Sequence, residues 1–139
     1  MRRVLLIGAV VVTLVSGAGL VAASAAGPAS GGVVEIPVTI HNSRFVPGAI
    51  TVAAGTKVRF VVDNTDPIDH EFLVGDQSVQ DRHETGTEAH HGAVPGEISV
   101  PADEVATTTY LFDRPGTVLM GCHLPGHWDY GMQGAISVT

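Results

Sequence analysis

Short stretches of alternating or β-branched residues recur along the chain from residue 33 to its end. Lys57 to Asp63 begins with a regular alternation of polar and apolar residues, and Val33 to Ile40 is rich in β-branched side chains. Runs of about four to eight such residues predict β-strands with one buried face. By the same signals we expect further strands at residues 49–52, 70–74, 97–100, 105–112, 117–120 and 133–138.

Turn-forming residues separate the predicted strands. Asn64-Thr65-Asp66-Pro67 ends one apolar run, and Asp113-Arg114-Pro115-Gly116 is a strong turn signal between two others. Phe45 to Gly48 also indicates a turn, and Pro37 suits a sheet edge or a bulge. Seven to eight short strands with little helical periodicity predict an all-β sandwich or barrel.

Residues 76–95 break this pattern. The segment is polar, rich in acids and histidines, and lacks a clear strand signal. We expect a loop or a short helix that packs outside the sandwich.

The N-terminal segment has the layout of a secretory signal peptide. Met1 to Arg3 is basic, Val4 to Val15 is almost wholly apolar, and Ala23-Ser24-Ala25 resembles a cleavage site. The alternative is an uncleaved membrane anchor, because the apolar run approaches the roughly 20 residues that span a bilayer. We expect this division of the chain: a signal peptide at residues 1–26, a linker at 27–32 and one domain at 33–139.

Charge limits the partners of the exported domain. The whole chain has a net charge of −7, and loss of Arg2 and Arg3 with the leader would bring it to about −9. An acidic domain is a poor partner for nucleic acid or anionic lipid. We therefore expect no nucleic-acid partner and a basic or neutral protein surface instead. The predicted location is periplasmic, extracellular or at the cell surface, and membrane contact requires an uncleaved N-terminus.

The chain contains one cysteine, Cys122, so an exported domain cannot form an internal disulfide. A single thiol in an oxidising compartment needs something to occupy its sulfur, or burial as an inert group. His127 and Met132 follow at regular spacing on the same short loop. A thiolate, an imidazole and a thioether are three of the four ligands of a blue copper site, whose fourth is a second histidine.

His70 is the candidate for that second imidazole, since it follows a turn and opens a predicted strand. The pattern Asn-x5-His-x-Phe, followed far downstream by Cys-x4-His-x4-Met, resembles the cupredoxins. These are small type 1 (blue) copper proteins, and the loop is most similar to their plastocyanin-like and sulfocyanin-like members. The resemblance covers about residues 33 to 139. It implies a Greek-key β-sandwich and one type 1 copper per chain, held by His70, Cys122, His127 and Met132.

The resemblance also implies a role for each ligand. Cys122 binds as the thiolate, His70 and His127 complete a plane, and Met132 is the weak axial ligand that tunes the potential. His127 is the expected electron port, with redox partners docking near it. Asn64 is a candidate outside the ligand set, whose hydrogen bonds would tie the His70 turn to the cysteine loop. The alternatives are that Met132 is a plain core side chain and that Asn64 is a turn residue.

Outside this set of copper ligands lie His123 and a cluster of three histidines. His123 follows Cys122, but Gly121 precedes it, so the His-Cys-His arrangement of multicopper oxidases is lacking. Along a strand His123 should point away from Cys122, as an exposed or hydrogen-bonded histidine. His83, His90 and His91, with neighbouring acids, are a possible second site for Zn or Cu(II), or simply a solvated acidic loop.

These observations favour an exported electron carrier with one type 1 copper, which shuttles single electrons between a donor and an acceptor and is not an enzyme. We expect a monomer. The first alternative is a copper-binding protein for copper resistance, storage or delivery. The second is a cupredoxin-like module that holds no metal. Copper should give the carrier an intense colour, whereas a delivery protein should release copper readily.

Overall fold

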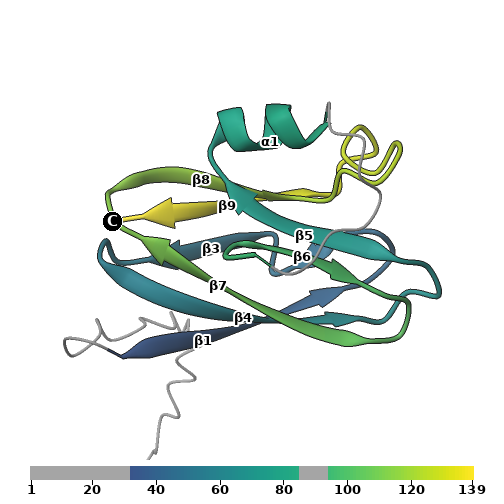
Figure 1. Ribbon diagram of the computed structural model, residues 1–139, viewed down its shortest axis with the longest axis horizontal. Coiled ribbons are helices and arrows are strands. Elements are labelled where there is room, and N and C mark those ends of the chain that lie inside the picture. Colours follow the sequence, from purple (N-terminus) through teal and green to yellow (C-terminus); the bar gives the residue numbers. More distant parts are fainter. Residues whose placement is uncertain (1–31, 85–93) are drawn as a thin grey trace, which may run out of the picture.

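The structure is a computed structural model that describes residues 32–84 and 94–139. Within these residues it consists of two β-sheets and one short helix (Figure 1). The elements are β1 (Val33–Ile40), β2 (Phe45–Val46), β3 (Ala49–Val52), β4 (Thr56–Asn64), β5 (His70–Gly75), α1 (Gln77–Glu84), β6 (Glu97–Val100), β7 (Val105–Phe112), β8 (Gly116–Gly121) and β9 (Gln133–Val138).

The strands form a two-sheet sandwich in which neighbouring strands of a sheet are often not consecutive in the sequence. One sheet has the order β2-β1-β4-β7 and the other β3-β9-β8-β5-β6. The β1–β4 and β3–β9 pairs are parallel, and the other pairs are antiparallel. The predicted all-β sandwich is therefore confirmed. The described part has nine strands rather than seven to eight, because the two-residue β2 pairs with the end of β1 where the sequence indicated only a turn.

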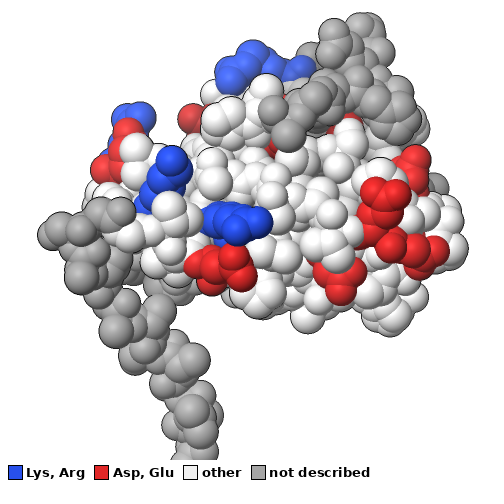
Figure 2. All heavy atoms as spheres, turned by 60° about the horizontal axis from the view of Figure 1, so that its bottom comes forward, with Lys and Arg blue, Asp and Glu red and all other residues white. Residues whose placement is uncertain are grey.

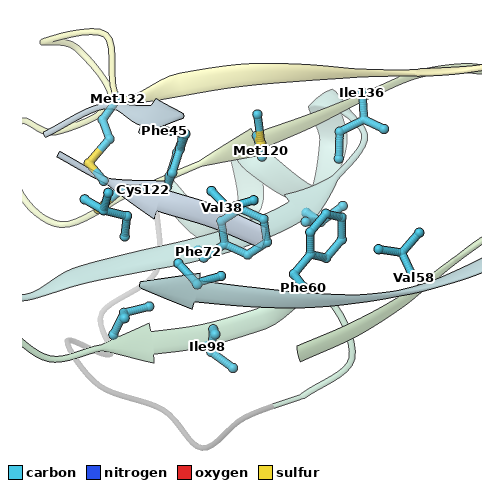
Figure 3. Packing of buried hydrophobic residues seen from close by; sticks show 14 of the residues in the cluster. Val38, Phe45, Val58, Phe60, Phe72, Ile98, Met120, Cys122, Met132 and Ile136 are labelled. Carbon is cyan, nitrogen blue, oxygen red and sulfur yellow. The ribbon is translucent and has the colours of Figure 1, made fainter. Parts of the chain in front are cut away.

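The core lies between the two sheets and follows the alternation that predicted it. In β4, Val58, Phe60 and Val62 are fully buried, while Lys57 and Arg59 face outward. Side chains one residue apart on a strand point to opposite faces, so this alternation places Val58, Phe60 and Val62 in the core. Figure 3 shows Cys122 and Met132 at one end of this core and Val58 toward the other.

β5 is different, because all six of its residues are buried. One of its faces contributes Phe72 and Val74 to the core between the sheets. The opposite face, with Glu71 and Leu73, is covered by α1, which lies over β5 and β8 (Figure 1). The helix predicted as one option for residues 76–95 is thus confirmed for Gln77–Glu84.

The N-terminal predictions lie largely outside the described residues. The predicted signal peptide at residues 1–26 and most of the linker at 27–32 precede residue 32, where the description begins. Among residues 32–84 and 94–139, no helix has both the length and the apolar character needed to cross a membrane.

Candidate metal centre

Strand pairing brings the two halves of the site together. β5 runs antiparallel to β8 with Leu73 opposite Gly121, so the start of β5 lies beside the segment that follows β8. His70 is the first residue of β5, and Cys122 comes directly after β8. Residues more than 50 positions apart therefore meet at one end of the sandwich.

Three side chains converge at this end. One ligand atom from each of His70, Cys122 and His127 lies within 4.8 Å of the other two. The His127 Nδ1 atom is 3.3 Å from the Cys122 sulfur and 3.2 Å from Nδ1 of His70. A thiol and two imidazole nitrogens at these separations surround a point that one metal ion can occupy. His70 and Cys122 are buried, and His127 is partly exposed.

Backbone hydrogen bonds close the loop that carries the other ligands. The Cys122 amide donates to the Met132 carbonyl at 3.2 Å, and the Met132 amide donates to the His127 carbonyl at 3.0 Å. Gly126 and Gly131 have φ values of 82° and 87°, a left-handed conformation that side chains disfavour. These glycines allow the chain to turn twice within the loop and present His127 and Met132 at fixed positions.

Met132 is fully buried at the same end of the core as Cys122 (Figure 3). The hydrogen bond between Cys122 N and Met132 O makes the two residues neighbours in the backbone as well. This position is compatible with the predicted axial role, which stays a prediction.

Burial dominates the chemistry of the thiol. Cys122 has no exposed surface, and burial raises the pKa of its thiol to about 11. Backbone N–H groups of Glu71 and Leu124 oppose this shift, and the Glu71 amide lies 3.3 Å from the sulfur. A buried thiolate needs a compensating cation, and a metal ion at the convergence point supplies one.

His127 is adapted to bind as a neutral imidazole. Partial burial, and then the nearby His70, lower the pKa of His127 below its usual value. The ring is therefore neutral at pH 7, and neutral imidazole is the form that coordinates metals.

The sequence reasoning missed one residue at the site, Asp66. Its carboxylate accepts a hydrogen bond from His70 Nε2 at 3.0 Å, on the side of the ring opposite the other ligands. The backbone amides of Asn42 and Ser43 also donate to it, both at 2.7 Å. Although burial works against it, these amide hydrogen bonds lower the pKa of Asp66 below its usual value. The only signal in the sequence was an acid four residues before the histidine.

Asn64 has a structural role close to the predicted one, but with a different partner segment. Its Nδ2 group donates to the carbonyls of Ile68, Val100 and Pro101 at 2.8–3.0 Å, and its Oδ1 accepts from the Asp66 amide. Asn64 therefore ties the turn before His70 to the end of β6. The expected hydrogen bonds from Asn64 to the cysteine loop are replaced by hydrogen bonds to the carbonyls of Val100 and Pro101.

His123 points away from Cys122, as the alternation along the strand predicts. Its Nε2 lies 2.8 Å from Gln80 Oε1 and its Nδ1 contacts Glu84, both on α1. Its ring stacks on Trp128, with centroids 4.6 Å apart and 16° between the planes. Of the two predicted states, exposed or hydrogen-bonded, His123 adopts the second.

The possible second metal site is only partly described. His83 lies on α1, with Nε2 3.4 Å from Glu71 and Nδ1 3.9 Å from Glu97. His90 and His91 lie outside the described residues. The second site stays a prediction.

The donor set of the main centre can be tested against metals by its chemistry. A buried thiol selects soft or borderline ions, and two imidazoles beside it suit copper and zinc. A thioether at the same end of the core adds a donor that favours copper over zinc. Copper thus fits the residues that the fold brings together.

Comparison with known proteins agrees with this chemistry. The family described as "cupredoxin-like domain" matches residues 7–90, a stretch that includes His70 and ends before Cys122. The copper-resistant cuproprotein CopI of Rubrivivax gelatinosus is 35% identical over 98 residues, which cover 68% of this chain and 59% of that protein. This chain therefore spans less than two-thirds of that relative.

A second relative aligns over nearly its full length. The copper-resistant cuproprotein CopI of Pseudomonas aeruginosa is 27% identical over 176 aligned positions, covering 99% of this chain and 97% of that protein. Among solved structures, auracyanin B superposes with a TM-score of 0.64 at 22% identity, covering 76% of this chain and 88% of that one. At that identity the superposition shows a shared fold.

Proposed function

The chain belongs to the cupredoxin-like domain family, and on that premise we propose that it is an exported copper protein that carries single electrons between redox partners. The family match confirms the resemblance to cupredoxins, and with it the copper cofactor, one ion per chain, which the grouped donor atoms fit. The observation that carries the proposal is the convergence of His70, Cys122 and His127 within 4.8 Å, with the thiol fully buried.

In this proposal His70, Cys122, His127 and Met132 hold the copper, which supplies a one-electron Cu(I)/Cu(II) couple. Electron transfer is fast when the ligands move little between the two oxidation states. Cys122 is anchored by its own backbone bond to Met132 and by the Glu71 amide at its sulfur. His70 begins a fully buried strand and is held by Asp66. Rigid donors of this kind favour a carrier over a protein that must open to release its metal.

His127 is the proposed electron port, because it is the one partly exposed member of the described group. A redox donor and an acceptor would dock in turn over this residue. A metal enzyme would require an open coordination position beside a general acid or base. An electron carrier requires neither, and the role that we propose is that of a carrier and not of an enzyme.

Charge at the same end supports a basic docking partner. Acidic side chains gather at the end of the molecule that carries the β4–β5 and β6–β7 connections (Figure 2). The exposed acids of these connections and the adjoining strand end are Asp63, Asp69, Asp103 and Glu104. Because Asp69 accepts a hydrogen bond from the Ala102 amide, the two connections form one surface next to His70. Positive charge on a partner would be attracted to this end.

A second candidate function is copper binding for resistance, storage or delivery in the periplasm or outside the cell. The observation in its favour is the name of both relatives, copper-resistant cuproprotein. A protein with this role has to exchange copper with a partner. The rate of exchange therefore separates the two functions.

The discriminating experiment cycles the copper-loaded protein between ascorbate and ferricyanide in the presence of a Cu(I) chelator. We expect one copper to remain bound through many cycles, with a reversible one-electron wave in voltammetry. Cys122→Ser is the matched variant, since it removes one sulfur at the centre and should lose both retention and the wave. Rapid transfer of copper from the wild type to the chelator, without a reversible wave, would contradict the carrier and support delivery.

A further inference from the structure

Asp66 links a distant turn to the copper ligand His70. The side chain of Asp66 is 8% exposed and that of His70 is fully buried, and their hydrogen bond measures 3.0 Å. Resting on the proposed function, we propose that Asp66 is a positioning residue that sets the tautomer, the orientation and the electron density of His70. It accepts the Nε2 proton, leaves Nδ1 for the metal, and favours Cu(II) over Cu(I).

The direction of this hydrogen bond follows from a count of donors. An ionised carboxylate only accepts, and both oxygens of Asp66 already accept a backbone N–H, one from Asn42 and one from Ser43. The contact with His70 therefore requires a proton on Nε2. In the neutral ring, Nδ1 then carries the lone pair, and Nδ1 is the atom 3.2 Å from His127 Nδ1.

The backbone around Asp66 is built to hold this carboxylate in place. Asn42 and Ser43 both have φ values of 52°, an uncommon left-handed conformation for residues other than glycine. The turn that they form points two consecutive N–H groups at Asp66, and these bonds offset the strain. The Asp66 amide is held by Asn64 Oδ1, and its carbonyl accepts from the Asp103 amide at 3.3 Å. Asp66 is thus fixed at its backbone and at both side-chain oxygens.

The consequence for copper is electrostatic as well as geometric. A carboxylate that accepts the imidazole proton increases the electron density on the coordinating nitrogen. This higher electron density stabilises the more highly charged Cu(II) more than it stabilises Cu(I). Loss of the carboxylate should therefore weaken Cu(II) binding more than Cu(I) binding, which raises the reduction potential.

The test compares Asp66→Asn with Asp69→Asn, which removes an equal charge from an exposed side chain of the same connection. We expect Asp66→Asn to lose about 10- to 100-fold in Cu(II) affinity, to lose less in Cu(I) affinity and to shift the potential upward. Asp69→Asn should change each quantity much less. Equal shifts in both variants, or none in Asp66→Asn, would overturn the positioning role.

A second measurement needs no variant, so it decides the question if Asp66→Asn does not fold. Nitrogen-15 NMR of the wild-type Cu(I) form should show His70 with a slowly exchanging proton on Nε2. A proton on Nδ1 would overturn the proposal. The same spectrum of the metal-free protein separates this inference from the proposed function: a wild type that binds no copper but shows the Nε2 proton contradicts the function alone.

Discussion

At the residue scale, the site combines a buried thiol with an imidazole, His70, whose far ring nitrogen is hydrogen-bonded to Asp66. Burial raises the pKa of the Cys122 thiol to about 11, so its thiolate form requires a metal ion as counter-charge, and His70 gains its orientation from Asp66. The resemblance of the sequence pattern to the cupredoxins implied His70, Cys122, His127 and Met132 as ligands. It could not indicate Asp66, because the amides that hold that carboxylate come from a turn more than 20 residues earlier.

Metal binding should depend on pH through Cys122. Since burial raises the pKa of this thiol to about 11, the thiol is protonated at pH 7 and must release its proton when metal binds. Affinity for Cu(I) should therefore rise about tenfold per pH unit between pH 7 and pH 9 and level off above the thiol pKa. His127 adds nothing to the pH dependence of the affinity, because its lowered pKa leaves the imidazole neutral between pH 7 and pH 9. Chelator competition measures the slope, and a pH-independent affinity would contradict this origin of the proton.

The axial role of Met132 can be tested against a matched methionine. Met132 and Met120 are both fully buried, and Met120 lies two residues before Cys122 in the core. Met132→Leu should keep the copper, raise its reduction potential and alter the visible spectrum, because Cu(II) loses a weak donor. Met120→Leu should change the free energy of unfolding slightly and leave spectrum and potential unaltered. Identical spectra for both variants would assign Met132 to the core only.

At the element scale, β4 and β5 differ in how far their sequences predict them. The alternation of β4 predicts its buried face directly, and the structure confirms it. β5 has no such alternation in burial because α1 covers its outer face, and the polar helix gave only a weak signal of its own. Packing of α1 depends on residues outside it, among them His123 from the cysteine loop and Trp128 stacked on His123.

His123→Ala should therefore loosen α1 without removing copper. The variant loses the contacts with Gln80 and Glu84 and leaves polar groups partly buried, at a cost of about 1–3 kcal/mol in the free energy of unfolding. Hydrogen exchange of the α1 amides should become faster. His41→Ala is the control, because the His41 side chain is exposed and its ring is hydrogen-bonded to Thr65, away from α1. Unchanged exchange in α1 of His123→Ala would contradict this anchoring role.

At the scale of the whole molecule, the ligands, the partly exposed His127 and the acidic connections all lie at one end of the sandwich. The sequence predicted the net charge, but the clustering of these acids depends on the fold. The acids of the two connections share one end because the β6–β7 connection packs on the β4–β5 connection, through hydrogen bonds from the Ala102 amide to Asp69 and from the Asn64 amide to the Glu104 carbonyl. An electron carrier of this design should exchange electrons faster with cationic reagents than with anionic ones.

Ionic strength should affect the two kinds of reagent in opposite directions. The rate with hexaammineruthenium should fall as salt is added, since attraction is screened, and the rate with hexacyanoferrate should rise. Asp69→Asn combined with Glu104→Gln should flatten both slopes. Asp113→Asn with Glu35→Gln removes the same charge from exposed positions away from the ligand end and should flatten them less. Equal effects of the two double variants would contradict docking at the acidic end.

The most direct test of the central claim is the visible and spin-resonance spectrum of the Cu(II) protein, with copper counted per chain. We expect one copper per chain and an intense visible band from thiolate-to-copper charge transfer. We also expect the narrow copper hyperfine splitting of a covalent Cu–S bond, and Cys122→Ser should abolish both features. A protein that binds one copper but shows no such band would contradict the convergence of Cys122 with His70 and His127 on a single ion.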